Sequence, residues 1–154
     1  MKSVARAAVH TAALFLAGAT VLAGCASIPL LQTRAERADE AARAAGWVGE
    51  NFTAGRFTLR GYRPRIRAEG GALAVYIEGD GVAWVSPTVR SSDPTPDDTL
   101  TLQLAMLDPT PNRLYLARPC QFLPPRELAA CSPDYWTSHR YAPEIVAALN
   151  DAIE

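Results

Sequence analysis

The fold class that we expect for this chain rests on residues Leu73-Ala74-Val75-Tyr76-Ile77-Glu78-Gly79-Asp80-Gly81. An apolar run that ends in Gly-x-Gly predicts a strand followed by a tight turn. Because the run is apolar rather than alternating, we expect burial on both faces, as in the middle of a parallel sheet. Gly79 and Gly81 let backbone amides approach a ligand, or permit a positive φ. Since open α/β sheets bind ligands at the carboxyl ends of their strands, this turn is the first candidate site. The alternative is a strand-exit turn without a ligand.

The residues after this turn predict a βαβ unit. Pro96 suits the first position of a helix, with Thr95 as its cap. Three leucines recur at helical spacing and predict one buried stripe; they are Leu100, Leu104 and Leu107. Residues 113–117 form a second apolar strand. The order strand, helix, strand predicts a parallel, right-handed crossover.

Further elements are expected on either side of this unit. Thr33-Arg34-Ala35-Glu36 has the spacing of a capping box and predicts a helix over about 34–45. Residues 52–62 predict one or two short strands near a sheet edge. Pro143 opens a last helix, with Ile145 and Leu149 on one stripe. The expected fold class is therefore α/β, with a parallel βαβ core and flanking helices.

The start of the chain predicts export. Charged residues at 1–6 precede an apolar run at 12–23, which is too short to span a bilayer and is typical of a secretory signal. Leu22-Ala23-Gly24-Cys25 then resembles the lipobox of bacterial lipoproteins. The resemblance implies that residues 1–24 are a signal peptide, that Cys25 is lipidated, and that residues 25–33 are a tether. Ala26 after the cysteine implies anchoring to the outer membrane, on its periplasmic side. The alternatives are an unmodified signal ending and a spanning anchor.

Composition limits the other functions. The chain has 154 residues, 49% of them hydrophobic, and a formal charge of -1, which suits one domain and lacks the basic stripe of a nucleic-acid-binding protein. In an oxidising compartment we expect a disulfide between Cys120 and Cys131, a reactive thiol being the alternative. Two cysteines and His139 do not make an ordinary closed zinc site. No metal and no cofactor are predicted.

Two further site hypotheses have simpler alternatives. Clustered carboxylates suit a hard cation; the candidates are Glu78, Asp80, Asp93, Asp97 and Asp98. The alternative is a solvated loop with acids at a helix start. His139 suits a general base because its ordinary pKa is near neutral, and the alternative is a loop histidine.

Four blocks of sequence, taken in order, resemble one known family. The blocks are Tyr76–Trp84, Asp93–Pro96, Tyr115–Gln121 and Trp136-Thr137. Together they are similar to the amino-terminal half of proteobacterial α/β-hydrolase-fold lipoproteins. The similarity covers nearly all of residues 25–154, and the resemblance implies a partial hydrolase-like sheet over residues 34–154.

The resemblance also implies a site. The strand that carries Tyr76 would be the third strand of the hydrolase sheet, and Glu78-Gly79-Asp80-Gly81 would take the place of the H-G-G-G-type loop. In α/β-hydrolases that loop contributes a backbone amide to the oxyanion hole. The amides of Asp80 and Gly81 are the candidates here, and one such donor is typically worth about 3 to 4 kcal/mol in the transition state.

One part of the family pattern is missing. The sequence contains no G-x-S-x-G, the turn that carries the nucleophile in this fold, and it stops where the strand before that turn is expected. No catalytic residue is therefore assigned, and whether the chain is an enzyme stays open. We expect a truncated serine hydrolase of a small ester or amide, inactive by itself and attached to membrane lipid. The alternative is a non-catalytic outer-membrane lipoprotein that binds a ligand or partner through its Gly-Asp-Gly loop.

Overall fold

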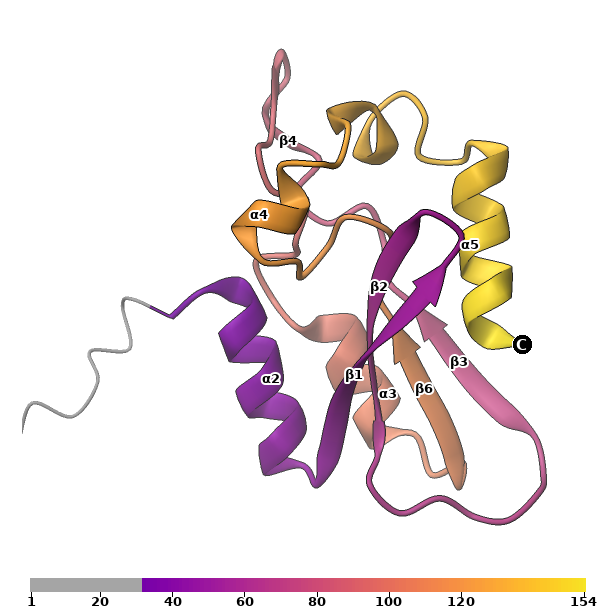
Figure 1. Cartoon of the computed structure of the whole chain (residues 1–154). Coiled ribbons are helices and arrows are strands. Elements are labelled where there is room, and N and C mark those ends of the chain that lie inside the picture. Colours follow the sequence, from indigo (N-terminus) through magenta and orange to yellow (C-terminus); the bar gives the residue numbers. More distant parts are fainter. Residues whose placement is uncertain (1–31) are drawn as a thin grey trace, which may run out of the picture. The chain divides into compact units, whose positions relative to one another are not determined.

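The computed structural model describes residues 32–154, so the expected signal segment and Cys25 lie outside the described residues. Its centre is a four-stranded sheet with the strand order β1-β2-β6-β3 (Figure 1). The strands are β1 (Trp47–Ala54), β2 (Phe57–Pro64), β3 (Leu73–Ile77) and β6 (Asn112–Leu116). A small two-stranded sheet is made by β4 (Trp84–Ser86) and β5 (Val89–Arg90).

The sheet is mixed. β1 and β2 form an antiparallel hairpin, whose turn begins with Gly55 at a φ of 57°. β2 pairs antiparallel with β6, through Gly61 opposite Leu116. β3 and β6 are parallel over their whole length and are joined through the helix α3 (Leu100–Leu107). The predicted βαβ unit and the α/β class are therefore confirmed.

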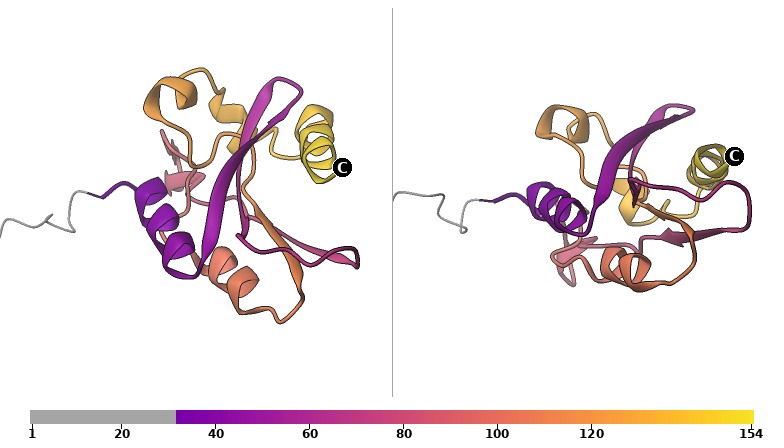
Figure 2. Two further views of the ribbon diagram at one scale, coloured as in Figure 1. Left: turned by 60° about the horizontal axis from the view of Figure 1, so that its bottom comes forward. Right: turned by 90° about the horizontal axis from the view of Figure 1, so that it is seen from below.

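Helices cover both faces of the sheet. α2 (Arg34–Ala44) and α3 lie on one face, and α5 (Pro143–Ile153) lies on the other (Figure 2). The capping box predicted for α2 is present, because the Thr33 hydroxyl accepts from the amide of Glu36 and the Glu36 carboxylate accepts from the amide of Thr33. Two short helices, α4 (Pro125–Leu128) and the 3-10 helix η2 (Pro133–Trp136), connect β6 to α5. Within residues 32–154 no helix has the length and apolar character needed to cross a bilayer.

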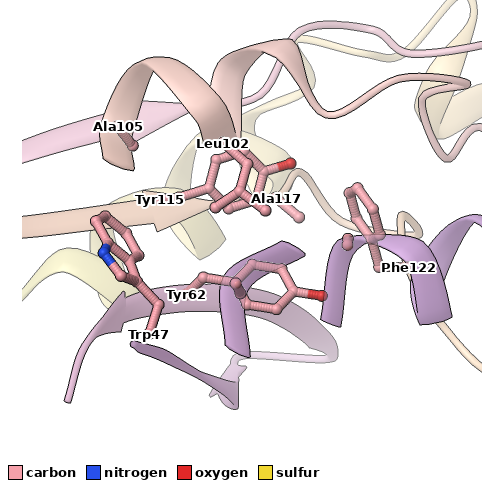
Figure 3. Close-up of a cluster of buried hydrophobic side chains, with 9 residues drawn as sticks. Trp47, Tyr62, Leu102, Ala105, Tyr115, Ala117 and Phe122 are labelled. Carbon is pink, nitrogen blue, oxygen red and sulfur yellow. The ribbon is translucent and has the colours of Figure 1, made fainter. Parts of the chain in front are cut away.

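Two apolar clusters of the core lie on opposite faces of the sheet, and a third, smaller cluster contains Ala83, Cys120 and Trp136. Under α2 and α3, the rings of Tyr62 and Tyr115 lie 5.7 Å apart and contact Phe122 (Figure 3). Under α5, Leu59 and Leu116 pack with further apolar side chains, among them Phe57, Ala54 and Ile145. Side chains alternate between the faces because successive strand residues point to opposite sides. β2 and β6 thus hold both layers together.

The expectation that 73–77 lies in the middle of the sheet is wrong. β3 is an edge strand, and the side chains at its two ends, Leu73 and Ile77, are 42% and 44% exposed. The parallel strand that is buried on both faces is β6. Its position between β2 and β3 explains the burial, since it has a neighbour on each side.

The predicted buried stripe on α3 is also wrong. Leu100, Leu104 and Leu107 are 59%, 51% and 80% exposed, and the helix instead buries Leu102 and Ala105. The helix starts at Leu100 rather than at Pro96. The Thr95 hydroxyl does not cap it, because that oxygen accepts a hydrogen bond from the amide of Phe122.

Candidate functional site

The turn after β3 begins with a buried carboxylate. Oε2 of Glu78 accepts a hydrogen bond of 2.7 Å from the hydroxyl of Tyr115, and Oε1 accepts one of 2.8 Å from the hydroxyl of Thr101. Burial and the neighbouring carboxylate raise the pKa of Tyr115, so its hydroxyl remains a neutral donor. The side chain of Glu78 therefore ties the end of β3 to β6 and α3.

The backbone amides of this turn fall into two groups. The amide of Glu78 donates to the carbonyl of Leu116 and that of Val82 donates to the carbonyl of Pro94. The amide of Gly79 donates to the Glu78 side chain. Within residues 32–154, the amides of Asp80 and Gly81 have no hydrogen-bond partner. These two are the donors that the family resemblance implies for an oxyanion hole.

The two glycines of the turn have different roles. Gly81 has a φ of 59°, and a Cβ added there would overlap the carbonyl oxygen of Pro94 and lie 2.9 Å from Nε2 of Gln121. Only glycine fits that position without strain. A Cβ added at Gly79 would meet no atom within 4 Å. The backbone at Gly79 is therefore open to an approaching molecule.

The side chain of Asp80 lies in a cluster of charges. Its Oδ1 lies 2.6 Å from Nη1 of Arg118, and its Oδ2 lies 3.4 Å from Nε of Arg140. Arg118 also donates to the backbone carbonyl of Arg140. Both guanidinium groups lie against the ring of Tyr141, at 5.1 and 5.3 Å from its centroid. The turn after β3 is thereby connected to the segment that precedes α5.

A groove of about 400 Å³ opens beside this turn. Gly79, Asp80, Arg118 and Arg140 form its polar end. Its apolar part comes from the end of β3 and from α5, with Ile77, Ile145, Val146 and Leu149. Gly79 and Asp80 thus line a surface groove, whereas Gly81 is not among its lining residues.

The carboxylates of the predicted cation site do not come together. Asp80 is paired with Arg118, and both Asp93 and Asp97 lie within ion-pair distance of Arg34, at 3.7 and 2.8 Å. In the described part of the chain, no group of three or more metal-ligating side chains is close enough to hold an ion. The solvated-loop alternative fits these acids better.

The remaining predicted residues lie apart from the groove. His139 is exposed, with its Nδ1 2.9 Å from the hydroxyl of Ser138, and it does not line the groove. Cys120 and Cys131 form the predicted disulfide, with their Cα atoms 6.0 Å apart. The disulfide closes the loop that follows β6.

Sequence reasoning missed the side chains that hold the turn in place. Tyr115, Arg118 and Gln121 belong to one of the quoted blocks, but their partners lie 37 to 42 residues earlier in the chain. Arg140 lies outside all four blocks. The order of the strands brings them together, and no local pattern indicates it.

Comparison of the chain with protein-family models, with curated proteins and with solved structures found no match.

Proposed function

We propose that residues 34–154 are the amino-terminal half of an α/β-hydrolase-like domain in an envelope lipoprotein. Its chemistry is serine-dependent hydrolysis of an ester or amide, and the chain is inactive by itself. The observation that carries the proposal is the pair of unpartnered amides, Asp80 and Gly81, in the turn after β3.

The strand order supports this proposal. The parallel pair β3 and β6, joined through α3, is the βαβ core that the hydrolase resemblance implies, and β2 pairs antiparallel with β6. The turn after β3 is then the counterpart of the loop that donates to the oxyanion.

The outer edge of β3 supports it as well. The amide of Glu78 donates toward β6, to the carbonyl of Leu116. Because backbone groups alternate in direction along a strand, Leu73, Val75 and Ile77 direct their N–H and C=O groups away from β6. A further strand can pair there, and in the hydrolase fold the nucleophile turn follows such a strand.

The chemistry assigned to this half is electrostatic. When a nucleophile attacks an ester or amide carbonyl, negative charge develops on the carbonyl oxygen. The amides of Asp80 and Gly81 would donate hydrogen bonds to that oxygen. The nucleophile, the base and the acid of the triad would come from the second half.

The cellular location of the protein is part of the proposal. The lipobox sequence supports lipidation of Cys25 and anchoring to the outer membrane on the periplasmic side. Membrane lipid is then the first partner of the chain, through the acyl groups on the cysteine. The disulfide Cys120–Cys131 is compatible with an oxidising compartment.

Activity measurements test the proposal in two arms. The chain alone is incubated with a p-nitrophenyl ester and with a fluorophosphonate probe, and we expect neither turnover nor labelling of a serine. The DNA that follows the gene is read in all three frames for a segment that encodes a strand followed by G-x-S-x-G. The polypeptide that this segment encodes is then co-expressed with the chain. Labelling of its serine in the complex is expected. Turnover by the chain alone, or a complex that fails to assemble or to react, contradicts the proposal.

The alternative is a non-catalytic lipoprotein that binds a ligand or partner through the Gly79–Gly81 turn. The open groove beside Gly79 favours it, because a groove binds molecules with or without a nucleophile. A compact monomer that melts cooperatively and has no catalytic second half would support this alternative over the hydrolase.

A further inference from the structure

The turn that follows β6 has an unusual backbone. Cys120 and Phe122 have φ values of 74° and 57°, and they are the non-glycine residues with positive φ in the described part of the chain. Such conformations are unfavourable for residues with a Cβ and persist where the surroundings fix them. They lie on both sides of Gln121.

Three contacts fix this turn. The disulfide ties Cys120 to Cys131. The amide of Phe122 donates a hydrogen bond of 2.8 Å to the hydroxyl of Thr95. Oε1 of the Gln121 side chain accepts from the amide of Arg118, at 3.0 Å. Together they direct the side chain of Gln121 inward, where only 1% of it is exposed.

The buried amide of Gln121 contacts the turn after β3. Its Nε2 donates a hydrogen bond of 3.0 Å to the carbonyl oxygen of Gly79 and lies 3.4 Å from the carbonyl oxygen of Pro94. The Gly79–Asp80 peptide bond is trans, as are the other described bonds. In a trans peptide the C=O and the following N–H point in opposite directions. The Asp80 N–H therefore points away from Gln121.

We propose that Gln121 is a positioning residue, which fixes the Gly79–Asp80 peptide so that the Asp80 amide is presented outward as a hydrogen-bond donor. Gly79 and Asp80 line the groove. The carbonyl oxygen of Gly79 accepts from Gln121, so it is held on the opposite side of the peptide from the Asp80 N–H. The turn at residues 120–122 holds Gln121 in place. The functional meaning of this orientation rests on the proposed oxyanion hole, but the orientation itself does not.

The test measures the Asp80 amide directly by NMR on the full 154-residue chain. The variants are Gln121→Met and Gln121→Leu, each of which removes both the donor and Oε1. The matched control is Thr137→Val, because Thr137 is also buried and also donates to a backbone carbonyl, that of Pro133. The measured quantities are the ¹⁵N order parameter of Asp80 and the NOE between its N–H and the α-protons of Gly79.

We expect the Asp80 order parameter to fall from a rigid value near 0.85 to below about 0.6 in both Gln121 variants, with a changed NOE, and to stay unchanged in Thr137→Val. A rigid Asp80 amide with the wild-type NOE in either Gln121 variant would overturn the proposal. If both variants fail to fold, the wild-type spectrum decides: an NOE from the Gln121 side-chain amide to the α-protons of Gly81 must be present, and its absence overturns the proposal. If the Asp80 amide becomes mobile in the Gln121 variants but no hydrolytic complex can be assembled, the positioning role of Gln121 is supported and the oxyanion-hole assignment is wrong.

Discussion

The hydroxyl of Tyr115 donates a hydrogen bond of 2.7 Å to Oε2 of Glu78, across a separation of 37 residues in the chain. Tyr115 is the next-to-last residue of β6 and is fully buried, and Glu78 is the first residue after β3. The bond joins the two parallel strands at their carboxyl ends. Because the acceptor is a buried carboxylate, the loss of this donor is costly.

Tyr115→Phe should therefore destabilise the fold. The substitution keeps the ring and leaves Oε2 of Glu78 without the hydroxyl, so we expect the free energy of unfolding to fall by about 2 to 3 kcal/mol. Urea denaturation at pH 7 measures the change. The control is Tyr62→Phe, because Tyr62 lies in the same cluster but donates to Asp39, whose side chain is 50% exposed. Water can replace that hydroxyl, and a loss of no more than about 1 kcal/mol is expected. Equal losses in the two variants would contradict the assignment.

Gly81→Ala should be far more harmful than Gly79→Ala. The first substitution puts a Cβ at a φ of 59° and against the Pro94 carbonyl, while the second puts a Cβ in open space. We expect Gly81→Ala to lower the free energy of unfolding by about 1 to 3 kcal/mol. Gly79→Ala should change it by less than about 1 kcal/mol. Thermal or urea melts of the pair decide, and a reversed order would show that the turn has another conformation.

The disulfide should stabilise the domain. Cys120 and Cys131 are 11 residues apart, and closing a loop of this size is worth roughly 3 kcal/mol, mainly by restricting the unfolded chain. Urea denaturation with and without a reductant measures this value. The double variant Cys120→Ala/Cys131→Ala should resemble the reduced protein and should not respond to the reductant. A response in that variant would mean that the reductant acts elsewhere.

Asp108 should make stability depend on pH in acid. The hydroxyl and amide of Thr110 and the hydroxyl of Tyr76 donate to its carboxylate, which lowers the pKa of Asp108 from 3.8 to about 2. The unfolded chain therefore takes up the proton first, so this stabilisation is complete above about pH 4 and is lost as the pH falls toward 2. Asp108→Asn should flatten the decline of the unfolding free energy between pH 5 and pH 2. Parallel curves for the two proteins would contradict this.

Cys25→Ser should abolish lipid attachment. In cells that express the full chain and are fed labelled palmitate, the wild type should carry the label and sediment with outer membranes. Cys25→Ser should do neither. Cys120→Ser/Cys131→Ser is the control, and it should keep the label because the proposed acylation site is unchanged. Labelling of the Cys25 variant would argue against the lipobox.

The sequence predicted the local elements of this fold well. Gly79 and Gly81 end an apolar run, and that local signal placed the turn at the carboxyl end of β3. The capping box at Thr33 likewise marks the start of α2. Such elements are predictable because their periodicity and their glycines act within a few residues.

The arrangement of the elements was less predictable. β3 lies at the edge because β6 pairs between it and β2, and the strand's own composition carries no information about that order. In α3, apolar residues occur on both faces, so the pattern does not indicate which face is buried. Leu102 and Ala105 are buried because that face packs on Tyr115 and its cluster.

The candidate site was likewise predictable only in part. The amides of Asp80 and Gly81 were singled out by the resemblance of Glu78–Gly81 to the hydrolase loop, and that resemblance rests on a local stretch of sequence. Gln121 and Arg118 were not, because their roles depend on contacts with a turn about 40 residues earlier. A fixed backbone donor requires side-chain support from elsewhere in the fold, and a single sequence does not show where that support comes from.

The open edge of β3 also has a consequence for handling the protein. Leu73 to Ile77 contains no charged residue and no proline, so the strand lacks the features that usually prevent edge-to-edge aggregation. When the chain is produced alone at high concentration, these five residues are where self-association and inclusion-body formation should start. A lysine placed on that strand is the first change to make for a soluble preparation.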